Sequence, residues 1–147
     1  MRNIFILSIV IIASFGLLDA MQIFPWQQSE QWEIYTLHVV PAILGMWAVT
    51  LLAIAIIYYL ITKDKSAAVG IFVSAKIMMW GGLQDVFFFL LSPNQMTPEM
   101  CWFGSTQAVV SKILGEACVT PLSLILNATL FTYLAYIVLK WFWRQKW

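Results

Sequence analysis

Charged side chains are scarce in this chain. Only 10% of its 147 residues are Asp, Glu, Lys or Arg, whereas an average soluble domain has about 25%. The net charge is +1, and no run of basic residues offers a surface for nucleic acid. Hydrophobic residues make up 62% of the chain and are spread over its whole length. These features exclude a soluble domain and predict a small polytopic membrane protein with a single integral domain over residues 1–147.

Metal ligands are equally few. The chain has one histidine, His38, and two cysteines, Cys101 and Cys118, which form no CxxC motif and no spacing typical of a metal site. This set does not supply a structural zinc site or a bis-histidine haem site, so we expect no metal and no cofactor. Cys118 lies in an apolar run and Cys101 in a loop, which argues against a disulfide between them without excluding it.

Four apolar segments are each long enough to cross a bilayer. They cover residues 4–24, 37–61, 67–91 and 106–141. The first is interpreted as a retained span, because a signal-peptide cleavage after Ala20 would place Leu18 where a small residue is usual. Pro121 cannot donate to the carbonyl of Ala117, which predicts a kink near Thr120. The predicted fold is therefore all-α, a four-transmembrane-helix bundle whose fourth helix is kinked at proline.

The basic residues outside the apolar interior predict the orientation. With four spans, all of them fall on one side: Arg2, Lys63, Lys65, Lys140, Arg144 and Lys146. The two loops on the other side carry only Glu30, Glu33 and Glu99 as charged residues. The positive-inside rule then predicts a multi-pass protein of the plasma membrane with both termini in the cytoplasm.

Five charged residues lie in the interior of the apolar segments, away from their ends: Asp19, Lys76, Asp85, Lys112 and Glu116. A charge at the centre of a membrane helix costs roughly 2.5–3.5 kcal/mol on insertion scales, so such residues usually face the protein interior and often have a function. Expected depth in the bilayer pairs Lys76 with Glu116, and Lys112 with Asp19 or Asp85. One acid is then left without a counter-ion, and a neutral carboxyl of this kind suits a general acid or a proton carrier.

Helical spacing groups polar residues on common faces. On the fourth segment the predicted stripe consists of Lys112, Glu116, Thr120, Ser123 and Asn127. On the third segment one face contains Gly70, Ser74, Gly81 and Asp85. For the hydroxyl and amide residues of these helices, including Ser8, the alternative is ordinary packing, because such groups form hydrogen bonds between membrane helices.

These faces provide the candidate site residues. The candidates for catalysis are Asp19, His38, Asp85 and Glu116, and those for ligand binding are Lys76, Lys112, Thr120, Ser123, Asn127 and Trp80. His38 is alternatively an interfacial histidine just before a helix start. Weak metal binding by His38, Asp19, Asp85 and Glu33 is a less favoured alternative.

No motif identifies a family, and three functions are compatible with the pattern. The preferred hypothesis is a buried polar site in the outer half of the bundle that binds or processes a lipid-like or other apolar ligand; it leaves open whether the protein is an enzyme. The second is a proton- or ion-conducting transport subunit that acts as a homo-oligomer. The third is a non-catalytic assembly partner of a larger membrane complex. Membrane lipids are the expected surroundings in all three.

Overall fold

The computed structural model describes residues 1–27, 40–91, 99–101 and 107–144; the side chains of residues 22–27 and 40–44 lie outside the description. Its helices are α1 (Arg2–Gln27), α3 (Val40–Thr62), α4 (Lys65–Trp80), α5 (Leu83–Leu91), α6 (Val109–Ile113) and α7 (Pro121–Arg144). Within these described residues, the extended structure is a single antiparallel bridge between Met100 and Val119. The all-α prediction is confirmed.

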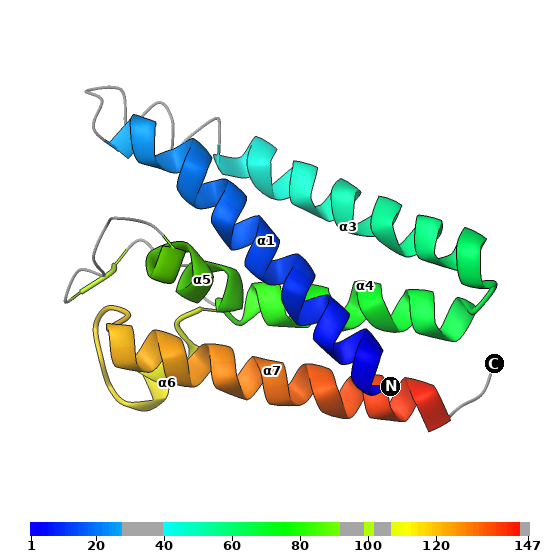
Figure 1. The fold of residues 1–147 in the computed structure, drawn as a ribbon. Helices are drawn as coiled ribbons and strands as arrows, with labels where there is room; N and C mark the ends of the chain where they lie inside the picture. The colour runs from blue at the N-terminus through cyan, green and yellow to red at the C-terminus, as the bar shows by residue number, and fades with distance from the viewer. Residues whose placement is uncertain (28–39, 92–98, 102–106, 145–147) are drawn as a thin grey trace.

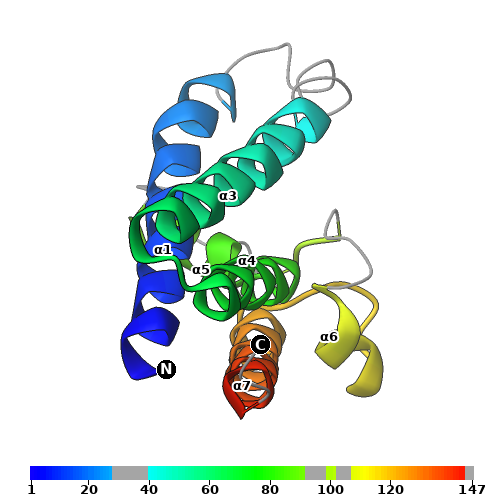
Figure 2. The ribbon, with the colours of Figure 1, turned by 90° about the vertical axis from the view of Figure 1, so that its right-hand side faces the viewer.

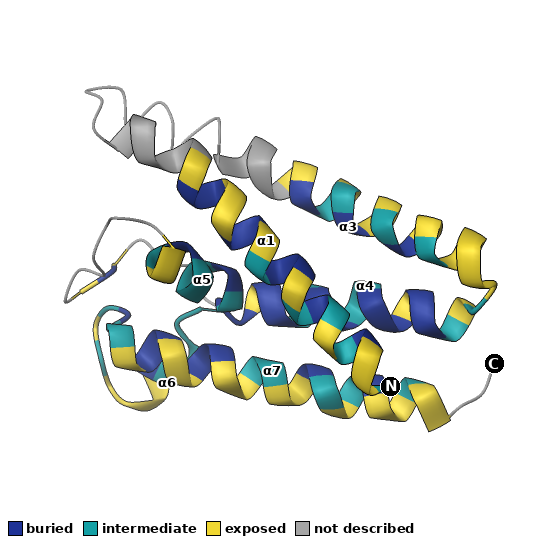
Figure 3. Ribbon diagram, viewed as in Figure 1, coloured by how far each residue is buried: buried dark blue, intermediate teal, exposed yellow. Residues whose placement is uncertain are grey.

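Three helices are long and apolar enough to cross a membrane. They are α1 over Arg2–Met21, α3 over Gly45–Thr62, and α7 over Pro121–Arg144. The pair α4 and α5 passes the same test jointly but is bent by 68°, so the described residues contain three such helices, or four if the bent pair is one span. Many large apolar side chains lie on the outside, among them Val49 at 68% and Ile61 at 76% exposure. Figure 3 shows exposed residues along the outer faces of α3 and α7, the arrangement that a lipid environment favours.

The third predicted span, residues 67–91, is broken rather than continuous. Helix α4 ends at Trp80, and α5 begins at Leu83 in a new direction. Gly82 has a φ of +87°, a left-handed conformation that glycine adopts without steric cost. At Gly81 a Cβ atom would collide with the Phe131 side chain, so α7 approaches the break closely. The predicted common face of Gly70, Ser74, Gly81 and Asp85 is therefore wrong beyond Gly81.

The fourth predicted span, residues 106–141, is also not one kinked helix. A short helix, α6, is followed by non-helical residues, and α7 begins at Pro121. The Thr120 hydroxyl accepts from the Ser123 amide at 3.2 Å, and the Ser123 hydroxyl accepts from the Thr120 amide at 2.9 Å. These reciprocal bonds cap the start of α7, and proline is well suited to a first helical position. The predicted kink and single polar stripe are corrected accordingly.

The helices pack in layers around a common core. Helix α4 packs against α7, α1 and α3, and α1 crosses over both α4 and α5 (Figures 1 and 2). Ile12, Leu51, Ile71, Met78 and Leu139 are among the buried residues that bring α1, α3, α4 and α7 together in the core. A Cβ at Gly16 would lie 2.7 Å from Phe87 Cβ. The absence of a side chain at that position lets α1 lie directly on α5.

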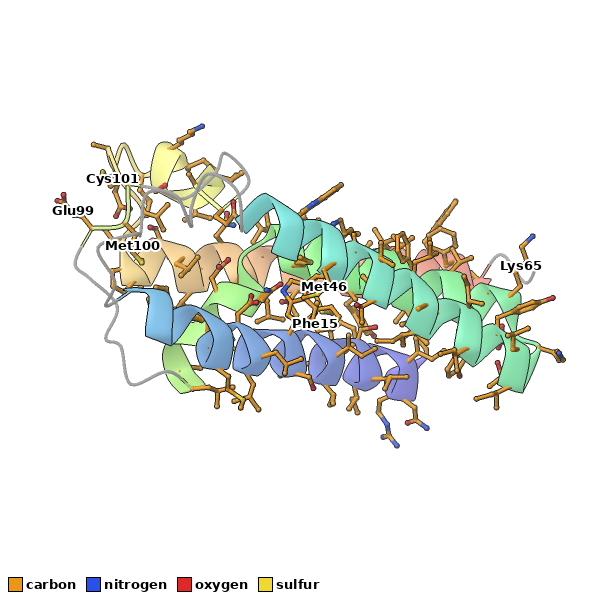
Figure 4. The ribbon with its side chains drawn as sticks, turned by 90° about the horizontal axis from the view of Figure 1, so that it is seen from above. Phe15, Met46, Lys65, Glu99, Met100 and Cys101 are labelled. Atoms are coloured by element: carbon orange, nitrogen blue, oxygen red, sulfur yellow. A yellow bond between two sulfur atoms is a disulfide. The ribbon has the colours of Figure 1, made fainter. Side chains whose placement is uncertain are left out.

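The two ends of the molecule differ chemically. The start of α1, the turn between α3 and α4, and the end of α7 share one end, while Glu99, Met100 and Cys101 lie at the other (Figures 1 and 4). At that second end a disulfide joins Cys101 to Cys118, with their Cα atoms 4.5 Å apart. The sequence argued against this bond, and that expectation is wrong. The Met100–Val119 bridge, one residue from each cysteine, holds the two segments side by side.

Candidate functional site

A buried carboxylate, Asp19, forms the centre of a polar cluster between α1, α3 and α5. Trp47 on α3 donates its indole Nε1–H to Asp19 Oδ1 at 2.9 Å. Gln84 on α5 donates its Nε2–H to Asp19 Oδ2. All three side chains are buried, with exposures of 7% for Asp19, 4% for Trp47 and 6% for Gln84. Both carboxylate oxygens are thus bound by neutral donors, which compensates part of the cost of burying an acid.

Packing holds the donors of this cluster in place. The Trp47 ring stacks on Phe15, one turn before Asp19 on α1, with ring centroids 4.4 Å apart and planes at 21°. The break at Gly81–Gly82 starts α5 on a new axis, and Gly16 lets α5 lie against α1. Gln84 therefore reaches Asp19 because of glycines at two places far apart in the sequence, Gly16 on α1 and the Gly81–Gly82 pair before α5.

The Gln84 amide is only half satisfied. Its Nε2 is bound to Asp19, but its Oε1 is buried and has no hydrogen-bond partner in the described part of the chain. Buried polar atoms are nearly always paired with protein or with a bound molecule. The next residue, Asp85, lies partly buried in the first turn of α5, close enough to Asp19 to interact with it electrostatically. The cluster thus presents one free acceptor and a second carboxyl.

The other charged candidates lie elsewhere. Lys76 is partly buried, with its Nζ 5.5 Å from the centroid of the Trp80 ring, an arrangement typical of a cation–π contact. Lys112 is exposed on α6. Glu116 is partly buried and accepts from the Thr120 hydroxyl at 3.3 Å. The two predicted pairings were Lys76 with Glu116, and Lys112 with Asp19 or Asp85. Neither ion pair is present among the described residues, so both predictions are wrong.

The hydroxyl and amide candidates have structural contacts. Asn127, fully buried, donates to the Gly81 carbonyl at 2.9 Å and accepts from the Val110 amide at 3.2 Å, so it links α7 to the helix break and to α6. The Ser8 and Ser74 hydroxyls lie 2.8 Å apart and join α1 to α4. Packing, the alternative interpretation of these residues, accounts for both contacts. Thr120 and Ser123 cap α7, as described above.

The metal site considered from the sequence includes His38 and Glu33, which lie outside the described residues. Among the described residues, Glu99, Cys101 and Cys118 bring potential ligand atoms within 4.8 Å of one another. The two sulfur atoms are joined in a disulfide, and a disulfide lacks the thiolates that bind metals. This group is therefore a crosslink in the state described.

Sequence reasoning identified Asp19 and Asp85 but missed Trp47 and Gln84. Two signals were available: the Gly81–Gly82 pair immediately before Gln84, and an indole donor within an otherwise apolar span. Comparison with known proteins adds no family, because no family model matches the chain and no curated protein or solved structure is significantly similar to it.

Proposed function

We propose that the protein is a four-span membrane protein that binds, or processes, a lipid-like ligand at the Asp19 cluster in the outer half of the bundle. The bent pair α4 and α5 would serve as the third span, and both termini would lie in the cytoplasm of a plasma-membrane protein. Two independent features support this orientation. Basic residues gather at one end of the helices, and the disulfide lies at the other. Disulfides persist mainly outside the cytoplasm.

The observation that carries the ligand proposal is the buried Gln84 Oε1 beside Asp19, which has no hydrogen-bond partner among the residues that the structure describes. A buried carbonyl oxygen of this kind is matched by an O–H or N–H donor. Aromatic side chains of α5, including the buried Phe88, follow Gln84 along the chain. We therefore infer an apolar molecule with a hydroxyl or amide head, whose donor would bind Gln84.

Access from the bilayer is supported by the exposed residues beside Asp19. Leu17 and Leu18 are 44% and 41% exposed, and Met21 is 68% exposed. A ligand dissolved in lipid would approach α1 along this apolar surface. Asp19 would accept or return a proton if the ligand reacts, with Asp85 as a second acid. His38 remains a predicted member of the site on sequence grounds.

The ion-conduction hypothesis loses its main support. It depended on a polar stripe along one fourth helix, and those residues are divided between α6, a non-helical segment and α7. No specific contact favours the third hypothesis, an assembly partner. The ligand-binding proposal is the one that an unexplained buried atom supports.

The test is mass spectrometry of molecules that remain bound after purification in native lipid. We expect the wild-type protein to retain one species with an O–H or N–H head. Gln84→Leu removes the acceptor and should lower occupancy about tenfold, which corresponds to about 1.4 kcal/mol. The matched control is Ser14→Ala on the exposed side of α1, where the hydroxyl donates to the Val10 carbonyl of the same helix. Its occupancy should match that of the wild type.

Two results would contradict the proposal. The wild-type protein retains no such molecule, or Gln84→Leu retains as much as the wild type. Asp19→Asn provides a second variant with nearly unchanged shape. A thermal unfolding midpoint measured for each variant separates loss of ligand from loss of fold.

A further inference from the structure

A cavity of about 540 Å³ opens at the basic end of the molecule. It is lined by the first turn of α1, by Tyr58 on α3 and by Trp143 on α7; the residues of that turn are Met1, Arg2, Asn3 and Ile4. Its volume is in the range of small-molecule sites, roughly 300–1,000 Å³. Arg2 lies some 17 residues before Asp19 on the same helix, roughly 25 Å at 1.5 Å per residue. The cavity is therefore separate from the Asp19 cluster.

We propose that this cavity binds the phosphate-containing headgroup of an anionic phospholipid. Arg2 presents a planar guanidinium that matches phosphate oxygens in a bidentate manner, and the neighbouring Asn3 amide offers a further donor. Arg2 and Asn3 are exposed, whereas Ile4, which also lines the cavity, is buried, at 5% exposure. The cavity is thus an open surface site that combines polar and apolar lining residues.

The aromatic walls fit the same ligand. Tyr58 is partly buried and Trp143 is 41% exposed. Tyrosine and tryptophan are enriched at the level of lipid headgroups, because their rings are apolar and carry one polar group. An acyl chain can follow the apolar outer faces of α3 and α7 away from the cavity, since those faces are lined with exposed leucine, isoleucine and valine.

Charge complementarity selects an anionic headgroup. Among the described residues, no acid lines the cavity. The surrounding described residues at this end include exposed Lys63, Lys65, Lys140 and Arg144. The nearby acid, Asp64, caps α4 by accepting from the Ala67 amide at 2.8 Å. Basic residues near a membrane surface attract anionic lipids. The site does not depend on the function proposed for Asp19.

The test is native mass spectrometry of the full chain in detergent, titrated with phosphatidylglycerol or with phosphatidylcholine of the same acyl chains. We expect one phosphatidylglycerol to be retained with at least tenfold preference. Arg2→Gln should weaken its binding about tenfold. The matched control is Arg144→Gln, which removes the same charge from the same end but outside the cavity, and should change binding by less than about threefold.

Several results would overturn the proposal. Phosphatidylcholine binds equally well, the two arginine variants lose affinity equally, or millimolar inorganic phosphate displaces the lipid. The last result would show a site for free phosphate. Trp143→Ala, on a different helix from Arg2, gives a second variant if Arg2→Gln does not fold; unchanged phosphatidylglycerol binding by Trp143→Ala would also overturn the proposal.

Discussion

At the scale of single residues, the interior carboxylate is stabilised by hydrogen bonds from neutral groups. Asp19 receives an indole N–H from Trp47 and an amide N–H from Gln84, and no lysine or arginine pairs with it among the described residues. Neutral donors are themselves cheaper to bury than an ammonium group. They also leave the carboxylate without a fixed counter-ion, so it can respond to a bound ligand.

Replacing the indole donor tests this arrangement. Trp47→Phe keeps an aromatic ring for stacking on Phe15 but removes the N–H that binds Asp19 Oδ1. We expect the free energy of unfolding to fall by about 1–2 kcal/mol, because a buried acceptor loses its donor. Unfolding in mixed micelles, followed by far-UV circular dichroism, measures the change. Trp141→Phe, at a position 53% exposed, should have almost no effect. Equal losses in both variants would argue against a special role for Trp47.

Asp19 could be predicted from the sequence as a candidate, because a carboxylate inside an apolar segment has a high free-energy cost of burial at any position. Its partners could not be predicted. Charge matching suggested lysines, yet Lys112 is exposed and Lys76 lies by Trp80. The true donors are uncharged, and their approach depends on how α3 and α5 pack against α1. Sequence spacing within one helix carries no information about such packing.

At the scale of elements, breaks between helices position the polar groups. Four apolar segments were predicted. The first three overlap α1, α3 and the pair α4 and α5, whereas the fourth is divided between α6, a non-helical stretch and α7. The break between α4 and α5 was not predicted, because the mean hydropathy of an apolar segment hardly changes over two residues. Gly81–Gly82 and the Thr120–Pro121–Ser123 cap are local signals, and the second was misinterpreted as a kink. A proline at a first helical position is recognisable by the hydroxyl residue before it.

Gly82 is the residue on which the break depends most. Its φ is +87°, and a Cβ there would lie 2.8 Å from Leu124 Cδ1. We expect Gly82→Ala to lower the free energy of unfolding by at least about 1–2 kcal/mol, because alanine is strained in the left-handed region. The variant should also reduce ligand occupancy at Gln84, because Gln84 lies only two residues after Gly82. Thermal unfolding and bound-molecule mass spectrometry measure the two effects.

The chain offers a matched control for this change. Gly45 lies in helix α3, and a Cβ there would meet no atom within 4 Å. Gly45→Ala should leave stability unchanged or raise it by roughly 0.5–1 kcal/mol, because alanine favours the helix over glycine. If Gly82→Ala proves as harmless as Gly45→Ala, the break does not require its left-handed glycine.

At the scale of the whole molecule, the difference between the two ends predicts the orientation in the membrane. Exposed Lys63 lies in the turn at the basic end, and the Cys101–Cys118 disulfide lies at the opposite end. In intact cells, a membrane-impermeant maleimide should not label the wild-type protein, because both thiols are oxidised. After treatment with an impermeant phosphine reductant, both cysteines should be labelled.

Lys63→Cys, in a background carrying Cys101→Ser and Cys118→Ser, should be labelled only after the membrane is permeabilised. Labelling of that variant in intact cells would reverse the proposed orientation, and labelling of the wild-type protein without reductant would show that its cysteines are free. Two unrelated physical effects set these labelling patterns, the cost of moving positive charge across the membrane and the redox state of the compartment. Agreement between the two patterns would therefore be a stronger result than either alone.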